Sequence, residues 1–448
     1  MVNSRAKHFV ALFPQQITDE IVTLAAGKRI WVAYSGGVDS HVLLHLLSQS
    51  NQSALKNLAA IHVDHGLHPD SAQWTQQCAD TAADLNVHFV SLTANVTNIE
   101  SLGMEAAARE ARYHALQQAL TADDILLTAQ HQQDQAETLL LQLFRGAGPK
   151  GLSAMAAQFL LGETDTIRPL LNVSQAEILA YAHQHHIQWI DDPSNVETRW
   201  NRNYIRHKLW PDIIQRWPSA ARTISRSAEH CAETSELLAD LAQQDLTILG
   251  VDKNSTSLPI TALLTLSMAR CRNALRHFML LKKCPLPSSV NLQRIIDEVC
   301  LAKQDAKPLV TWSGVEIRRY QDQLYFMSPL LKHNSKHIIK ITGFQNVALG
   351  DGRFIQWEKK VGEGLNFPET AEITLRFRQG GEQIKPQGGD HHKSLKHLFQ
   401  HWAIPPWQRD RIPLIFCDDK LVAVIGYCIS DSYRVNGEQK GYLPQFKD

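Results

Sequence analysis

The segment from Ser35 to Ser40 reads Ser-Gly-Gly-Val-Asp-Ser and combines two glycines, two hydroxyl side chains and one carboxylate. The glycines allow a tight turn that brings backbone N–H groups close to an anion, and the hydroxyl groups of Ser35 and Ser40 add donors. A helix that begins directly after the turn adds the partial positive charge of its N-terminus. Ser35, Gly36, Gly37, Val38, Asp39 and Ser40 are therefore predicted to bind phosphate. The lysine of the Walker loop is missing, so the segment is not that loop.

Asp39 would repel a phosphate unless a divalent cation lay between the two charges. One carboxylate together with phosphate oxygens is a common way to hold Mg²⁺. We therefore predict that Asp39 contacts Mg²⁺ bound with a nucleotide. Taken alone, the six residues also fit an ordinary turn that is capped by an aspartate.

Asp134 and Glu137 stand three residues apart at the start of a predicted helix, so they share one face. Two close carboxylates can bind an ammonium group, and one of them can act as a general base. On spacing alone, acidic residues favoured by the dipole of a helix N-terminus are the better explanation of the pair. Arg109 and Arg112 have the same spacing and would face an anion, or would form a solvated pair.

His62, Asp64 and His65 follow a predicted strand closely enough to suggest a metal site, but no further ligand is evident in the sequence. A contact of Asp64 with the adenine or ribose of a nucleotide is the favoured interpretation, and a structural turn is the alternative. The stretch 146–151 fits G-x-G-x-x-G, yet it follows a helix and contains proline. A dinucleotide site therefore fails on context.

Apolar runs that alternate with helical periodicity must position these residues. Strands are expected at 29–34, 58–64, 87–92 and 125–129, each followed by a helix. This alternation is typical of an α/β fold with a parallel sheet, in which ligands bind at the carboxyl ends of the strands. Every candidate residue above falls at such an end.

The chain of 448 residues suggests roughly three domains at about 150 residues each. We predict a catalytic α/β domain over 1–215, a mainly helical domain over 216–330 and a small mixed α/β domain over 350–448. The helices of the middle domain are expected at 222–245, 261–282 and 288–302. A hairpin is expected at 315–319 and 323–327.

The composition excludes several classes of protein. The seven cysteines are scattered and never show C-x-x-C spacing, which argues against a disulfide framework, a zinc ribbon and a cysteine-held iron–sulfur cluster. No apolar run approaches the about 20 residues that cross a bilayer, and no secretion signal is recognised. We expect a reduced, cytoplasmic protein with no membrane contact, and no stable protein partner is inferred.

The 45 basic and 45 acidic residues balance overall but not locally. The stretch 199–226 has seven Lys or Arg and one acidic residue, interleaved with Trp200, Tyr204, Trp210 and Trp217. The stretch 376–411 has seven Lys or Arg and three acidic residues. Such stretches can bind a nucleic-acid backbone and stack on bases. An amphipathic helix with buried tryptophans is the alternative for the first.

Several motifs in a shared order point to one family. They are the loop 35–40, I-H-V-D-H-G-L at 61–67, E-A-A-A-R-E-A-R-Y at 105–113, T-A-Q-H-Q-Q-D-Q-A-E-T at 128–138, R-G-A-G-P-K-G-L at 145–152, D-P-S-N at 192–195, R-N-Y-I-R at 202–206, R-F-R at 376–378 and I-P-P-W at 404–407. Together these resemble the long, three-domain form of tRNA(Ile)-lysidine synthetase, a PP-loop pyrophosphatase family.

The resemblance implies a fold, a reaction and a set of partners. The family uses ATP and Mg²⁺ to adenylate the wobble cytidine of tRNA(Ile) with a CAU anticodon, releasing pyrophosphate. L-lysine then replaces AMP at C2, which forms lysidine and changes the codon read from AUG to AUA. By the same resemblance, Asp39, Arg112, Asp134 and Glu137 are the predicted catalytic residues, the last three forming the lysine site.

The chain departs from the family pattern H-H-x-D-D-Q-x-E-T at two positions. Gln130 replaces the first histidine and Gln133 replaces the first aspartate; His68 also stands where the family has arginine. A different PP-loop enzyme, such as a thiolase or an amidotransferase, would need cysteines that this chain lacks near the loop. A catalytically silent tRNA-binding protein is the second alternative, which Gln133 keeps open.

Overall fold

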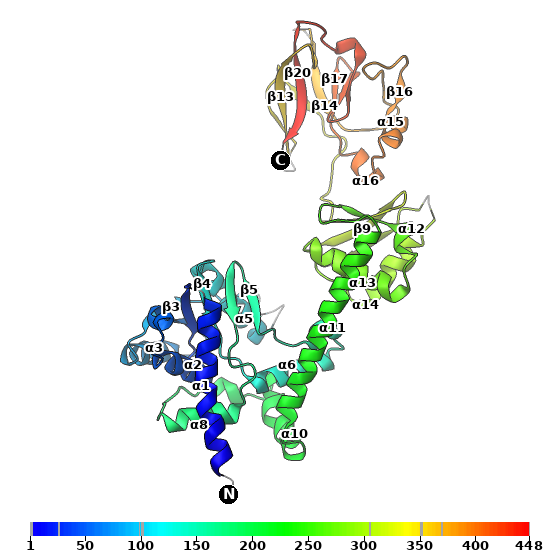
Figure 1. The fold of residues 1–448 in the computed structure, drawn as a ribbon. Coiled ribbons are helices and arrows are strands. Elements are labelled where there is room, and N and C mark those ends of the chain that lie inside the picture. The colour runs from blue at the N-terminus through cyan, green and yellow to red at the C-terminus, as the bar shows by residue number, and fades with distance from the viewer. Residues whose placement is uncertain are drawn as a thin grey trace. The chain divides into compact units, whose positions relative to one another are not determined.

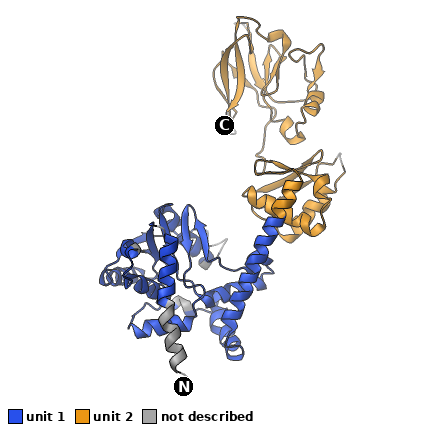
Figure 2. Cartoon of the chain, in the orientation of Figure 1, with its two compact units in different colours: residues 1–241 blue, residues 242–448 orange. Residues whose placement is uncertain are grey.

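The computed structural model describes residues 3–25, 27–97, 99, 103–303, 306–349, 353–368 and 371–447. The chain forms two compact units, Met1–Leu241 and Ala242–Asp448 (Figure 2). Each unit is described by itself. None of the described helices is long and apolar enough to span a membrane.

Unit 1 is built on a six-stranded sheet with the order β3-β2-β1-β4-β6-β5. The strands are β1 Arg29–Ala33, β2 Leu58–Asp64, β3 His88–Thr93, β4 Asp124–Leu127, β5 Gln158–Leu161 and β6 Thr164–Ile167. All neighbours pair in parallel except β5 and β6, which form an antiparallel hairpin. The parallel α/β sheet and its first four strands are confirmed. The hairpin β5–β6 was not predicted.

Successive side chains of β1 point to opposite faces of the sheet and pack in two hydrophobic cores, one on each face. Ile30 and Val32 pack in a cluster with residues of α1 Asn3–Ala25, α2 Val38–Ser48 and α8 Gln175–Gln184. Trp31 points to the opposite face and packs with Leu116 of α5 Met104–Ala119. Helices therefore cover both faces of the sheet (Figure 1).

The loop after β1 lies where the strand order reverses. β1 pairs with β2 on one side and with β4 on the other. From β1 the strand order runs to β2 and β3 in one direction and to β4 and β6 in the other. Such a switch point opens a crevice beyond the carboxyl ends of the strands, and ligands of doubly wound sheets bind there.

Further helices of unit 1 carry residues to that edge. They are α3 Ser71–Asp84, α6 Gln132–Phe144, α7 Pro149–Leu152, α9 Asn201–Tyr204, a π-helical turn Ile205–Leu209, α10 Trp210–Arg216 and α11 Ala220–Ile248. Trp210 is buried against Ala136 of α6 and Ala220 of α11 in a small core. This contact fixes the segment that follows α9 against α6.

Unit 2 contains helices and antiparallel sheets. The first sheet has the order β7-β10-β9-β8 and packs with α13 Met268–Leu281 and α14 Ser289–Arg294. Its strands are β7 Ser257–Pro259, β8 Leu309–Trp312, β9 Val315–Tyr320 and β10 Gln323–Met327. The predicted hairpin is therefore confirmed. The expected single helix 261–282 is wrong, because α12 Ile260–Leu263 ends early and Ser267 caps a new helix at Met268.

The last part of unit 2 is mainly antiparallel sheet with two short helices, α15 Leu395–His401 and α16 Pro406–Arg409. A five-stranded sheet has the order β11-β14-β17-β18-β19 and a three-stranded sheet has the order β12-β13-β20. Their strands are β11 Ile339–Ile341, β12 Val347–Ala348, β13 Phe354–Val361, β14 Ile373–Arg376, β17 Leu414–Cys417, β18 Lys420–Val424, β19 Cys428–Ile429 and β20 Lys440–Lys447. The division between the two units falls inside α11, and the three domain boundaries stay a prediction.

Candidate active site

The loop between β1 and α2 forms an open cradle. The hydroxyl of Ser40 accepts a hydrogen bond from the backbone N–H of Ser35 at 3.2 Å and donates one to the carbonyl of Gly37 at 3.0 Å. The two serine hydroxyl oxygens lie 3.1 Å apart. Gly37 is the N-cap of α2 and provides no side-chain cap. The first amides of α2 are thus available to an anion, as the helix dipole favours.

Gly36 is required by the geometry of this loop. Its φ is +83°, and a Cβ atom there would lie 2.6 Å from Cδ1 of Ile190 and 3.0 Å from Sγ of Cys78. The carbonyl of Gly36 also accepts the backbone N–H of Ile190 at 3.0 Å. The cradle therefore rests on a segment about 150 residues further along the chain, far beyond the reach of local sequence patterns.

Asp39 stands on the first turn of α2 with one free oxygen. Its Oδ1 is buried and has no hydrogen-bond partner among the described residues, while its Oδ2 lies 3.8 Å from Nε2 of His131. Burial raises the pKa of Asp39, the nearby His131 opposes the shift, and Asp134 adds to it. A buried carboxylate oxygen without a donor is chemically suited to a hard cation.

Asp134 and Glu137 lie on one face of α6, as expected, but two arginines occupy them. Arg206 donates to Oδ1 of Asp134 at 2.8 Å and to Oε1 and Oε2 of Glu137 at 2.7 and 2.9 Å. Arg202 donates to Oδ1 of Asp134 at 3.2 Å and to Oε2 of Glu137 at 3.1 Å. Glu137 is completely buried. We call these four residues the carboxylate–arginine cluster.

Asp134 also caps α6. Its Oδ2 accepts the backbone N–H of His131, and Nδ1 of His131 accepts the backbone N–H of Gln133, which completes a capping box. Burial opposes ionisation of Asp134, yet His131, Arg202 and Arg206 outweigh it and keep its pKa below the ordinary value. Asp134 is therefore anionic at neutral pH. Its predicted part in a lysine site stays a prediction.

Gln133 is buried and points into the same cluster. Its side-chain amide donates to Oε1 of Glu137 at 3.0 Å. An aspartate at this position could not donate that bond and would add a charge beside a buried carboxylate. The replaced family residue is thus compensated by a neutral hydrogen bond.

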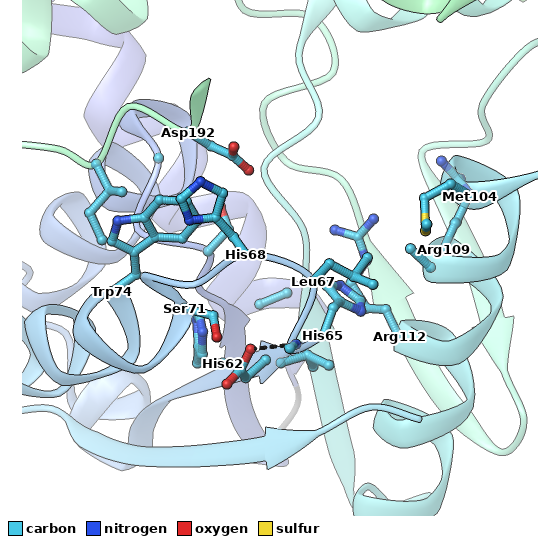
Figure 3. A pocket seen from close by; sticks show the side chains of 18 of the residues that line it. His62, His65, Leu67, His68, Ser71, Trp74, Met104, Arg109, Arg112 and Asp192 are labelled. Carbon is cyan, nitrogen blue, oxygen red and sulfur yellow. Dashed lines mark hydrogen bonds between the residues drawn. The ribbon is translucent and has the colours of Figure 1, made fainter. Parts of the chain in front are cut away.

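A cavity of about 660 Å³ opens at the carboxyl ends of β1 and β2 (Figure 3). Its walls include Ser35 and Gly37 of the loop and all three residues of the predicted strand-end group. His68 and Trp74 are stacked with their ring centroids 4.5 Å apart, and they face Met104 and Arg109 of α5 across the cavity. The size suits a nucleotide.

The strand-end residues differ in their freedom. Nδ1 of His62 lies 2.8 Å from the carbonyl of Tyr34, to which it can only donate, so His62 is a fixed packing residue. Oδ1 of Asp64 accepts the backbone N–H of Gly66 at 2.8 Å. Among the described residues, no group of three or more His, Cys, Asp or Glu side chains is arranged to hold a metal ion. The predicted nucleotide contact of Asp64 stays a prediction.

Arg112 gives the cavity a positive wall. Burial lowers its pKa, and the neighbouring Arg109 and Arg202 lower it further, so its surroundings are cationic. Burial and then Arg112 lower the pKa of His65 to about 4, and Nδ1 of His65 is buried with no hydrogen-bond partner among the described residues. His65 is consequently neutral at pH 7, and the pair favours an anionic ligand.

A second cavity of about 800 Å³ adjoins the first. Five arginines and no carboxylate line it: Arg109, Arg145, Arg168, Arg199 and Arg202. The buried Arg168 lies over the ring of Phe159 at 4.2 Å and donates to the side chain of Gln130 at 3.1 Å. Arg109, Arg199, Trp200 and Arg202 line both cavities. A cationic cavity thus shares one wall with the nucleotide-sized cavity.

Sequence reasoning gave Arg202 and Arg206 no role of their own. The motif that contains them placed them four residues apart, a spacing that puts two arginines on one helix face. The carboxylates at 134 and 137 also share one helix face. Two arginines on one helix and two carboxylates on another could have suggested that the two pairs bind each other. Arg168 belongs to none of the motifs quoted above, so the sequence gave no signal for its role.

Three family models match the chain. A PP-loop domain covers 9–213, a TilS substrate binding domain covers 258–325 and a TilS substrate C-terminal domain covers 373–445. These matches follow the order of the motifs in the sequence.

Curated relatives match nearly the whole chain. A tRNA(Ile)-lysidine synthase of Coxiella burnetii is 42% identical over 96% of this chain and 95% of its own length. Enzymes of the same name from Legionella pneumophila (strain Lens) and Serratia proteamaculans are 39% and 40% identical, over 92% and 91% of this chain and 94% and 93% of their own lengths. With this identity over almost the full length, the chain belongs to the tRNA(Ile)-lysidine synthase family.

Proposed function

We propose that the chain ligates L-lysine to C2 of the wobble cytidine of tRNA(Ile) with a CAU anticodon, using ATP and releasing pyrophosphate and AMP. The observation that carries the proposal is the shared wall between a nucleotide-sized cavity, which includes the phosphate-binding loop, and a cavity lined by arginines. ATP fits the first cavity and an RNA backbone fits the second. Their junction is where a base meets the α-phosphate.

In the first step, the cytidine O2 attacks the α-phosphorus of ATP and pyrophosphate leaves. Negative charge develops on the phosphoryl oxygens and on the leaving group. The open amides at the start of α2 donate toward this charge, and the hydroxyl of Ser40, which donates to the carbonyl of Gly37, holds the loop in that shape. Donors that are fixed before the reaction stabilise the transition state without reorganisation.

The residues at Asp39 fit a magnesium ion. The free, buried Oδ1 of Asp39 is a hard oxygen ligand, and Mg²⁺ in such sites takes few carboxylates and completes its shell with phosphates and water. When bound, the ion neutralises phosphate charge. Asp39 itself holds that position, with His131 next to its second oxygen.

In the second step, the side-chain amine of lysine attacks C2 and AMP leaves. At pH 7 only about one lysine amine in a few thousand is neutral, because its pKa is near 10.4. The site must therefore hold the ammonium and accept its proton. Asp134 and Glu137, on one face of α6, are the proposed carboxylates, and the ammonium would take the place of a guanidinium group of Arg202 or Arg206.

The substrates ATP, lysine and tRNA are those of the cytoplasm, where we expect the enzyme to act. The second cavity would bind the phosphate backbone next to the wobble nucleotide, because its arginines can neutralise the phosphate charge. Phosphate contacts position an RNA but do not read its sequence. Recognition of the remaining tRNA is assigned to unit 2, where one matching family model is described as a substrate binding domain and the other as a substrate C-terminal domain.

The test is incubation of the protein with ATP, Mg²⁺, labelled L-lysine and unmodified tRNA(Ile) with a CAU anticodon. We expect labelled tRNA together with an equal amount of AMP, and neither with tRNA(Met), which has the same anticodon. AMP release without label would place a defect in the lysine site and implicate Gln133. Binding of tRNA without either product would contradict the proposal and indicate a silent binding protein.

A further inference from the structure

Trp200 occupies a position that the proposed function leaves without a role. Of the four residues that line both cavities, three are arginines and only Trp200 is aromatic. It is the N-cap residue of α9, two residues before Arg202 of the carboxylate–arginine cluster. A nucleotide that reaches from the cationic cavity into the nucleotide cavity must therefore pass this ring.

The other aromatic residues around the two cavities are engaged elsewhere. Trp74 is stacked on His68, and Phe159 lies beneath the guanidinium of Arg168. Tyr34 is buried in the hydrophobic core against the sheet. Trp200 is half-buried and belongs to none of the hydrophobic clusters of the described residues. Packing of a core therefore does not explain it.

The surroundings of Trp200 match a single-stranded nucleotide. The guanidinium of Arg199 lies over the ring at 4.9 Å, and the Arg199 side chain is 70% exposed. The indole offers a stacking face for a base, and Arg109 and Arg145 of the second cavity supply cations for the flanking phosphates, whereas Arg199 pairs with Glu197 and Arg202 with the cluster carboxylates. A base removed from its stack needs such a replacement, because unstacking costs a few kcal/mol.

We infer that Trp200 is the stacking residue that holds the wobble cytosine at the junction of the two cavities, where its O2 meets the α-phosphate. The inference rests on the proposed function and makes Trp200 a substrate-binding residue for adenylation. Lysine enters after that step, so its apparent affinity should not depend on the ring.

The experiment uses the full-length protein and a tRNA(Ile) transcript with the fluorescent base pyrrolo-cytidine at the wobble position. Stacking on an indole quenches this base. We expect quenching with the wild type and with Trp200→Phe, and little quenching with Trp200→Leu, all measured without ATP. Phe144→Leu is the control, because Phe144 is an aromatic residue of the same unit that is 67% exposed and lines neither cavity.

Activity gives a second readout. In tRNA-dependent pyrophosphate release, Trp200→Leu should lower kcat/KM for the tRNA by about 5- to 150-fold, the equivalent of ~1–3 kcal/mol for one base stack. Trp200→Phe should recover most of this loss, and KM for ATP and for lysine should not change. Thermal unfolding of each variant identifies any loss of fold, and Trp200→Phe then decides the question.

Two outcomes would overturn the inference. Equal quenching and equal adenylation by Trp200→Leu would show that the ring is only a wall. A rise in KM for ATP instead of for tRNA would assign Trp200 to the adenine. Failure of the wild type to release pyrophosphate with tRNA(Ile) would contradict the proposed function itself. This outcome is distinct from the two above, because it does not depend on any change at Trp200.

Discussion

At the scale of single residues, the three carboxylates of the site have different surroundings. Both carboxylates on α6 are bound by arginines, whereas Asp39 keeps a buried oxygen without a donor. Burial raises the pKa of Asp39, so its ionised form is held at a cost to folding. Such a cost is typical of a group that is kept for function rather than for stability.

Asp39→Asn should therefore separate activity from stability. We expect pyrophosphate release to fall by about 10²- to 10³-fold, as when a fixed electrostatic stabiliser is removed. Because the folded-state pKa is raised, ionisation of Asp39 weakens folding as the pH rises through it, and the neutral amide removes this loss. The thermal midpoint at pH 7 should rise. Calorimetry and a pyrophosphate assay measure the two effects.

The control for this change is Asp84→Asn, which neutralises an exposed aspartate at the end of α3. It should alter neither quantity. An Asp39→Asn protein that remains fully active, or that unfolds at a lower temperature than the control, would show that the carboxylate is an ordinary structural residue.

The carboxylate–arginine cluster predicts the opposite balance. Removing one partner of a buried ion pair leaves an uncompensated charge, which costs ~3–5 kcal/mol, whereas removing both partners costs much less than the sum. Glu137→Leu and Arg206→Met should each lower stability by about that amount, and the double variant by less than the two together. Urea unfolding followed by circular dichroism measures this cycle.

An exposed pair provides the comparison. Arg294 and Glu298 stand four residues apart on the surface, at 2.7 Å, and Arg294→Met should change stability only slightly. Additive losses in the Glu137–Arg206 cycle would contradict a coupled cluster.

At the scale of elements, the sequence predicted what local patterns encode. The first four predicted strands are short apolar runs, and the two glycines of the loop 35–40 indicate a tight turn. The hairpin β5–β6 was missed because its strands mix Gln158, Thr164 and Asp165 with apolar residues and show no clear run. The break before Met268 was missed because Ser267 acts only through its cap.

The candidate site was predictable in part for the same reason. The phosphate-binding residues of the cradle are neighbours in the chain, so their types were sufficient to predict them, whereas the support of Gly36 by Ile190 was not predictable. Arg202 and Arg206 reach carboxylates 65 to 72 residues away, and this pairing depends on the packing of Trp210 against α6. No periodicity in the sequence reports a contact over that separation.

The junction of β1 and α2 allows a test of one element. Gly36 and Gly27 both have positive φ, at +83° and +87°, but a Cβ atom would clash with Ile190 only at Gly36. Gly27→Ala should cost ~1–2 kcal/mol through backbone strain alone. Gly36→Ala should cost more and should also weaken ATP binding, since the cradle must shift away from Ile190.

The two glycine variants are compared by thermal unfolding and by titration with ATP. Adding Ile190→Val to Gly36→Ala should recover part of the stability, because the nearest clashing atom, Cδ1, is removed. Equal losses of stability for the two alanine variants, with unchanged ATP binding in both, would show that the cradle tolerates a side chain.

At the scale of the whole molecule, both cavities belong to unit 1. Every residue that lines them falls within Met1–Leu241, while the helix α11 continues to Ile248 and contributes Leu246 to the core of unit 2. The chemistry should therefore need only the first unit, and productive binding of the long tRNA should need both.

A fragment of residues 1–241 distinguishes these two needs. We expect it to bind ATP as the full chain does, and to bind tRNA(Ile) at least about tenfold more weakly, a loss of ~1.4 kcal/mol or more.

The logarithm of the tRNA affinity falls with the logarithm of salt by about 0.7 to 0.9 for each phosphate neutralised. Because the fragment lacks the phosphate contacts assigned to unit 2, its salt dependence should be shallower. Fluorescence anisotropy at several salt concentrations measures both quantities, with thermal unfolding to establish that the fragment is folded. A folded fragment with the affinity and salt dependence of the full chain would show that unit 2 does not bind the tRNA backbone, and the arginine-lined cavity would then have to account for all of the binding.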